Sequence, residues 1–268
     1  MNGAQIILNH FGFSRMPFGK DIPIDQAFPS TSLAETTAML SLGLDGEDLM
    51  LITGAIGCGK SLLVRRAARE VDPDRYQLIY LRGGVSGVCE LYKLVLRGMQ
   101  VEPPHSFLKT KTAFFATVNE AEKKPIVIID DAQDAHPEAL LALKAMTNFE
   151  SDSRTRITFI LVGQPELASL LSLSHFESVR ERIRLAAKIA PMGLQETCAY
   201  IDHGLTIVER SEPLFSDDAK AQVFKRTHGI ARRINTVCYQ AIVQAAVEKR
   251  NIIDSQNLLP EPLAGLTD

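Results

Sequence analysis

The sequence predicts an α/β protein in which helices flank a parallel sheet of five strands, followed by a small domain built of helices alone. Three observations predict this class. Five apolar runs of strand length occur before residue 190, segments with helical periodicity lie between them, and the strand-like runs stop after Pro191. Strands that are apolar throughout and separated by helices are typical of a parallel sheet buried on both faces.

The expected elements alternate along the chain after an irregular lead-in, which ends in a helical pattern near residues 33–44. The expected strands are residues 49–53, 77–81, 126–130, 157–162 and, with a weaker pattern, 185–189. The expected helices between them are residues 61–70, 87–99, 110–122, 137–149 and 165–171. This alternation is typical of repeated strand–helix–strand units.

Three more helical patterns follow the last strand, at about residues 195–209, 216–227 and 231–249. We therefore expect a lead-in over residues 1–45, an α/β core over 46–190, a helical lid over 191–255 and a tail over 256–268 that contains prolines. No internal repeat or low-complexity segment interrupts this order.

Charge and composition limit the classes of function. The 268 residues include 29 Lys or Arg and 32 Asp or Glu, a net charge of −3, which excludes a chain-wide basic field but leaves a local basic patch open. No apolar run approaches the ~18–20 residues that span a bilayer. The first residues lack the basic start and apolar core of a signal peptide, and the four cysteines show no metal-binding spacing. We expect a cytoplasmic protein without a membrane partner.

A phosphate-binding loop follows the first expected strand. Residues 54–61 read GAIGCGKS and fit the pattern G-x-x-x-x-G-K-[ST] between a strand and a helix. Its glycines let backbone N–H groups surround a phosphate, Lys60 reaches the β- and γ-phosphates, and the Ser61 hydroxyl ligates Mg²⁺. We expect ATP and Mg²⁺ as cofactors, with these residues at the nucleotide: Gly54, Ala55, Ile56, Gly57, Cys58, Gly59, Lys60, Ser61 and Leu62.

An acidic pair ends the third expected strand, in the run PIVIIDD that closes with Asp130 and Asp131. Asp130 is expected to hold the Mg²⁺ shell, and Asp131 to orient and deprotonate the attacking water. A strand that merely ends in a solvated acidic turn is the alternative. Together with the phosphate loop, the pair predicts an enzyme that hydrolyses ATP.

Seven short blocks occur in an order that resembles the AAA+ ATPases of the ExeA (general secretion A) type, from about residue 10 to 255. In layout the chain is similar to the related transposition regulators MuB, TniB and TnsC. The blocks are residues 16–18 (MPF), 54–61 (GAIGCGKS), 129–133 (IDDAQ), 161–167 (LVGQPEL), 180–183 (RERI), 196–201 (ETCAYI) and 229–235 (GIARRIN). The resemblance implies a P-loop AAA+ core with a helical lid.

The resemblance also implies roles for two polar residues and one aromatic residue. Gln164, just past the fourth strand, corresponds to a sensor of the γ-phosphate, with a polar strand cap as the alternative. Arg232 corresponds to a lid arginine that closes on the nucleotide, and a surface arginine is its alternative. Phe18, in the lead-in, would pack around the adenine or serve as an ordinary core aromatic.

A further arginine is implied to act on a neighbouring subunit. Arg182 corresponds to an arginine finger, although Arg180 and Arg184 compete for that role and a solvated charge cluster is the alternative. This role would require a homo-oligomer, either a ring or a helical filament.

The chain departs from the family pattern at two positions. Asp131 stands where the family usually has Glu, so its side chain is one methylene shorter and we expect slow hydrolysis. Gly204 stands where the family has an arginine in its lid.

Three tasks are compatible with this chemistry, since one ATPase core hosts many functions. The first, which we favour, is a DNA-transposition regulator that oligomerises on duplex DNA in the ATP state and recruits or activates a transposase. The second is a secretion-assembly ATPase like ExeA, and the third is an ATP-gated scaffold with incidental hydrolysis. The expected absence of a membrane span and of a wall-binding domain after the lid favours the first.

Local charge supports DNA binding only weakly. Residues 180–250 contain 12 Lys or Arg and 8 Asp or Glu. Outside that segment, Arg82 after the second strand and Lys109 and Lys111 before the next helix are candidate phosphate contacts on loops. A lone basic residue on a loop is more often simply a solvated surface cation, and this is the alternative for each of them. Backbone contacts of this kind would tolerate any DNA sequence and weaken with salt.

Overall fold

The computed structural model describes residues 3–19, 22–149, 155–210 and 212–258. It divides into two compact units, which we describe separately. The α/β unit comprises Leu33–Ala55 and Gly59–Ile189, and the helical unit comprises the described parts of Met1–Ser32, Ile56–Cys58 and Ala190–Asp268. Most of the expected tail, residues 259–268, lies outside the described residues.

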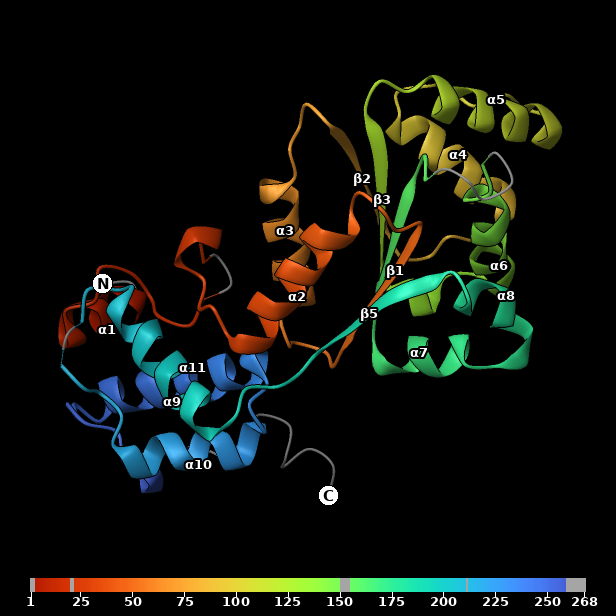
Figure 1. The fold of residues 1–268 in the computed structure, drawn as a ribbon. Coiled ribbons are helices and arrows are strands. Elements are labelled where there is room, and N and C mark those ends of the chain that lie inside the picture. Colours follow the sequence, from red (N-terminus) through yellow and green to blue (C-terminus); the bar gives the residue numbers. More distant parts are fainter. Residues whose placement is uncertain (1–2, 20–21, 150–154, 211, 259–268) are drawn as a thin grey trace. The chain divides into compact units, whose positions relative to one another are not determined.

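The α/β unit is built on a five-stranded sheet in which every pairing is parallel (Figure 1). Its strands are β1 (Leu49–Gly54), β2 (Tyr76–Arg82), β3 (Lys124–Asp130), β4 (Thr158–Gly163) and β5 (Ile183–Ile189), in the order β2-β3-β4-β1-β5. The predicted fold class is therefore confirmed. Since parallel strands end at the same edge of a sheet, the segments after β1, β4 and β3 lie side by side.

Burial explains the apolar patterns of the strands. Every residue of the central strands β1 and β4 is buried, whereas the edge strand β5 alternates between partly buried and exposed residues until its last residue. Central strands covered on both faces read as continuous apolar runs, and edge strands do not. This difference accounts for the weaker sequence signal of the fifth strand.

Helices cover both faces of this sheet (Figure 1). On one face lie α4 (Val88–Gly98), α5 (Phe107–Glu120), α6 (Pro137–Met146), α7 (Pro165–Leu171) and α8 (Glu177–Arg180). On the other lie α2 (Thr31–Gly43) and α3 (Lys60–Glu70), whose apolar side chains face Ile126, Ile128 and Ile160.

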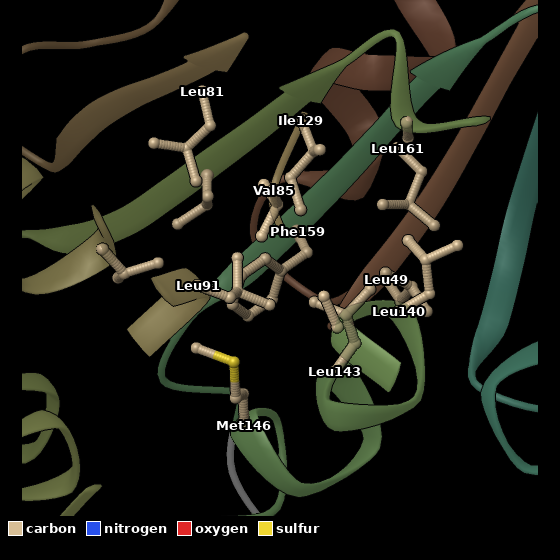
Figure 2. Packing of buried hydrophobic residues seen from close by; sticks show 14 of the residues in the cluster. Leu49, Leu81, Val85, Leu91, Ile129, Leu140, Leu143, Met146, Phe159 and Leu161 are labelled. Atoms are coloured by element: carbon tan, nitrogen blue, oxygen red, sulfur yellow. The ribbon is translucent and has the colours of Figure 1, made fainter. Parts of the chain in front are cut away.

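The larger core packs between the sheet and the first set of helices (Figure 2). Phe159 and Leu161 of β4 and Leu143 and Met146 of α6 are completely buried. Burying one such side chain stabilises a fold by about 1.5–3 kcal/mol. This packing fixes the sheet that carries the predicted phosphate loop.

The helical unit contains α1 (Gly3–Phe11), α9 (Leu194–Thr206), α10 (Asp217–Thr227) and α11 (Ala231–Val247), with short 3-10 helices at Ile24–Gln26 and Ser255–Asn257. The expectation of an irregular lead-in is wrong at α1. Phe11 is buried in the core of this unit, and Ile7 and Leu8 pack against that core, so packing stabilises a helix that its short sequence pattern does not reveal.

Two of the sequence blocks form contacts that hold the helical unit together. The hydroxyl of the half-buried Tyr200 donates to the side-chain oxygen of Asn235 at 2.7 Å, which joins α9 to α11. Loss of solvent around the phenol ring raises the pKa of Tyr200 to about 12. Glu196 accepts hydrogen bonds from the backbone N–H and the hydroxyl of Thr31, both at 2.8 Å.

Among the residues that the structure describes, none of the helices combines the length and the apolar character needed to cross a membrane.

We predict that Gly229→Ala lowers the free energy of unfolding of the helical unit by ~2 kcal/mol or more. Gly229 has φ +73°, and a Cβ there would lie 1.8 Å from the backbone oxygen of Met192. Chemical denaturation followed by circular dichroism measures the loss. Gly193→Ala is the matched control, because nothing lies within 4 Å of its Cβ position. An equal loss in both variants would contradict this reading of Gly229.

Candidate nucleotide-binding site

The loop between β1 and α3 has the backbone that a phosphate-binding loop requires. Gly59 has φ 106° and caps the amino end of α3, a conformation that favours glycine. The buried Lys60 ammonium donates to the carbonyl of Gly54 at 2.7 Å and of Ala55 at 3.2 Å, so it folds back over the loop. Ser61 follows on the exposed first turn of α3, and Leu62 is half-buried. Lys60 and the helix amino terminus thus place positive charge at one point.

The tip of the loop, Ile56–Cys58, groups with the helical unit. Within that unit the backbone N–H of Arg232 donates to the carbonyl of Gly57 at 3.2 Å. Gly57 has φ +85°, and a Cβ there would lie 2.5 Å from the Cβ of Arg232. The structure therefore places Arg232, the predicted lid arginine, next to the loop tip, with its side chain exposed.

Asp130 is buried at the end of β3, and both of its carboxylate oxygens accept hydrogen bonds. Oδ1 accepts from the backbone N–H of Asp131 at 3.0 Å, and Oδ2 accepts from the Tyr80 hydroxyl at 2.5 Å. Burial and this contact with Asp130 raise the pKa of Tyr80 to about 12. The carboxylate is therefore held in a fixed orientation at the edge of the sheet.

Asp131 lies directly after β3 in the left-handed region, with φ 52°. Its backbone packs closely against the chain after β2, because a Cβ on Gly83 would lie 2.9 Å from the carbonyl oxygen of Asp131. A non-glycine residue in this region costs about 1–3 kcal/mol and is often found at functional sites. The backbone therefore turns at Asp131 and leaves the direction of β3.

Gln133 links Asp131 to Gln164, a connection that the sequence reasoning missed. Its side-chain oxygen accepts from the backbone N–H of Gln164 at 3.1 Å, and its amide nitrogen donates to Asp131 at 3.4 Å. A Cβ on Gly163 would lie 2.7 Å from that oxygen, so glycine leaves the room that Gln133 needs. The only sequence signal for this role was the position of Gln133 two residues after the acidic pair.

Arg182, the predicted finger, lies directly before β5, at the amino ends of the strands and thus opposite the phosphate loop. Its guanidinium is 3.3 Å from the Thr147 hydroxyl and 4.0 Å from the carboxylate of Asp48, with 15% of the side chain exposed. The competing arginines are more exposed: Arg180 donates to the carbonyl of Ser172 at 2.9 Å, and Arg184 lies on β5. The choice of finger stays a prediction.

Phe18 is buried in the core of the helical unit, where its ring lies 6.4 Å from that of Phe215 in an edge-on arrangement. A Cβ on Gly204 would lie only 2.5 Å from the Phe18 ring. Phe18 thus occupies the space beside Gly204, the position at which the chain departs from the family arginine. Its predicted contact with adenine stays a prediction.

The candidate DNA contacts need a correction. Lys109 and Lys111 lie within α5 and not on a loop before it, because the helix begins at Phe107, whose ring packs on Tyr92. Arg82 is the last residue of β2, in register with Asp130, and not part of the following loop. All three side chains are exposed.

We predict that Gln133→Leu lowers ATP hydrolysis by about 10-fold, a fraction of the 10²–10⁴ that a positioned general base contributes. The change removes the amide that holds Asp131 and leaves the Gln164 N–H without its acceptor. A phosphate-release assay measures the rate. Gln77→Leu is the matched control, because Gln77 donates to the carbonyl of Gly98 in the same unit, away from the acidic pair. Equal rates in the two variants would contradict the role of Gln133.

Comparison with known proteins finds similarity over part of the chain to one protein family and over most of the chain to one curated relative. The protein-family description "AAA domain" matches residues 44–171. The chain is 26% identical over 250 residues to "General secretion pathway protein A" of Aeromonas hydrophila, covering 88% of this chain and 44% of that protein. The chain thus spans less than half the length of this relative. The match supports the resemblance to the general secretion A type and not the one to the transposition regulators.

Solved structures show the same fold at low identity. Cdc6p of Pyrobaculum aerophilum superposes with a TM-score of 0.69 at 15% identity, covering 88% of this chain and 67% of that one. The ORC1 protein of Aeropyrum pernix, solved in complex with DNA, gives a TM-score of 0.62 at 14% identity, with 90% and 66% covered. Together with the phosphate loop and the parallel sheet, these matches show that the core has the AAA-type P-loop ATPase fold.

Proposed function

We propose that this chain binds ATP with Mg²⁺, hydrolyses it slowly, and uses the ATP-bound state to assemble with copies of itself and with partner proteins. One observation carries the proposal: the carboxyl ends of β1, β3 and β4, which lie side by side in one sheet, carry or are followed by Lys60, Asp130, Asp131 and Gln164. A lysine at a helix amino terminus beside a fixed acidic pair is the arrangement that phosphoryl transfer requires.

The residues present suit Mg²⁺. The Ser61 hydroxyl and the Asp130 carboxylate are hard oxygen donors, the class that Mg²⁺ prefers alongside phosphate oxygens. Bound Mg²⁺ would supply charge neutralisation at the β- and γ-phosphates. Asp130 is buried with both oxygens already oriented, so it fits this role without rearrangement.

The remaining roles fall to side chains of this chain. Lys60 would exchange the carbonyls of Gly54 and Ala55 for phosphate oxygens. Asp131 would accept the proton of the attacking water, and Gln164 would contact the γ-phosphate. Arg232, beside the loop tip at Gly57, would add a further positive charge.

We predict that Asp131→Glu raises steady-state ATP hydrolysis and that Asp131→Asn lowers it by about 100-fold or more. The longer glutamate reaches the water that the aspartate reaches poorly, whereas the amide accepts no proton. A phosphate-release assay gives the rates, and titration with a fluorescent ATP analogue should show unchanged binding. Glu122→Gln serves as the control, since it neutralises an exposed carboxylate just before β3, at the end of the strand away from the acidic pair. Unchanged hydrolysis in Asp131→Asn would refute this role.

For the biological task, the match to general secretion pathway protein A supports an ATPase that assembles a secretion apparatus. The similarity extends over 88% of this chain and therefore includes residues of the helical unit as well as the core. The partners on this proposal are other copies of the chain and protein components of that apparatus.

A second candidate, a DNA-transposition regulator that binds duplex DNA and a transposase, draws support from the exposed cations Arg82, Lys109 and Lys111. Exposed lysines are the usual contacts of sequence-tolerant DNA binding. Arg82 also sits in register with Asp130, so DNA bound there would lie close to the hydrolytic residues.

Oligomerisation separates the two candidates. We predict that a non-hydrolysable ATP analogue converts the protein to a larger species in light scattering without DNA, and that Lys60→Ala, which lacks the phosphate contact, stays small. The same samples with duplex DNA at low salt provide the comparison. Assembly only with DNA, lost in the Lys109→Glu/Lys111→Glu variant while nucleotide binding is retained, would favour the transposition candidate and count against secretion.

A further inference from the structure

Tyr80 lies on β2, the outermost strand on one side of the sheet, and its hydroxyl reaches Asp130 on the neighbouring strand β3. The backbone of Tyr80 is in register with Ile128, so its side chain leans along the strand by two residues to contact Asp130. Tyr80 is 47% exposed, whereas Asp130 is 5% exposed. An exposed tyrosine thus donates a 2.5 Å hydrogen bond to a buried carboxylate.

The contact determines how the carboxylate is oriented. Oδ1 of Asp130 accepts from the adjacent backbone N–H of Asp131, and this bond by itself permits rotation of the carboxylate about its own side chain. The Tyr80 hydroxyl fixes the second oxygen from a different strand. Each carboxylate oxygen has two acceptor sites, so both retain one for a further partner.

We propose that Tyr80 is a positioning residue for Mg²⁺: its hydroxyl orients Asp130 so that the remaining acceptor sites face the metal shell. This inference rests on the proposed ATPase function. Groups that hydrogen-bond a metal-binding carboxylate fix its direction, and their loss typically costs 10–100-fold in metal affinity. Tyr80 itself touches neither the nucleotide nor the metal in this role.

The same strand supplies a matched control. The Tyr76 hydroxyl also donates to an aspartate, Asp45, at the opposite end of β2. Tyr76→Phe therefore removes the same kind of hydrogen bond from the same strand, away from the acidic pair. If such tyrosine–aspartate hydrogen bonds only stabilised the outer strand of the sheet, the two substitutions would have the same effect.

The test compares Tyr80→Phe with Tyr76→Phe and the wild-type protein. A fluorescent ATP analogue is titrated at increasing Mg²⁺ concentrations and, separately, in the presence of EDTA. For Tyr80→Phe we expect the Mg²⁺ concentration at half-saturation to rise by about 10-fold, with unchanged binding in EDTA. For Tyr76→Phe we expect both values to match the wild type. Thermal melting, measured on the same samples, reports whether each variant remains folded.

Several outcomes would overturn the inference. A Mg²⁺ half-saturation within twofold of the wild type in Tyr80→Phe would do so, as would an equal rise in Tyr76→Phe. If the wild-type protein bound the analogue with no dependence on Mg²⁺, the proposed ATPase function would fail and the inference with it. A wild-type Mg²⁺ dependence that Tyr80→Phe left unchanged would overturn the role of Tyr80 alone.

Discussion

The parallel pairing of β1, β4 and β3 is the constraint on which the candidate site depends. Because β4 lies between the other two strands, the residues that follow it stand between the phosphate loop and the acidic pair. An antiparallel neighbour would have turned one of these segments to the other edge. The arrangement needs close backbone approach at that edge, and glycine provides it at Gly163 and Gly83, where a Cβ would meet Gln133 and Asp131.

The acidic pair shows how much of such a site is made by residues outside the motif. Asp130 is oriented by Tyr80, which lies on a different strand, and Asp131 sits in a left-handed turn with Gln133 beside it. The carboxylates carry the chemistry, but these neighbours determine where the carboxylates point. Since Tyr80 is on the edge strand, its hydroxyl reaches Asp130 without displacing the core.

The sequence was sufficient to predict the five strands, most of the helices and the phosphate loop, because each has its own local pattern. Contacts between distant segments have no such pattern. Tyr80 is half of a hydrogen bond whose other half lies 50 residues away, and nothing in its neighbours distinguishes it from an ordinary strand tyrosine. For the same reason α1 was missed: it is stabilised by packing of Phe11 in a core formed mainly by residues after 190.

Arg182 illustrates what the geometry requires of an arginine finger. Asp48, which it faces, directly precedes β1, and Lys60 follows the loop at the other end of that strand. Six residues of β-strand span ~20 Å, which exceeds the reach of an arginine side chain. Arg182 therefore cannot serve the phosphate loop of its own chain. Any action on a nucleotide must take place in a second copy, and must compete with the contacts to Asp48 and Thr147 that hold the guanidinium in its own subunit.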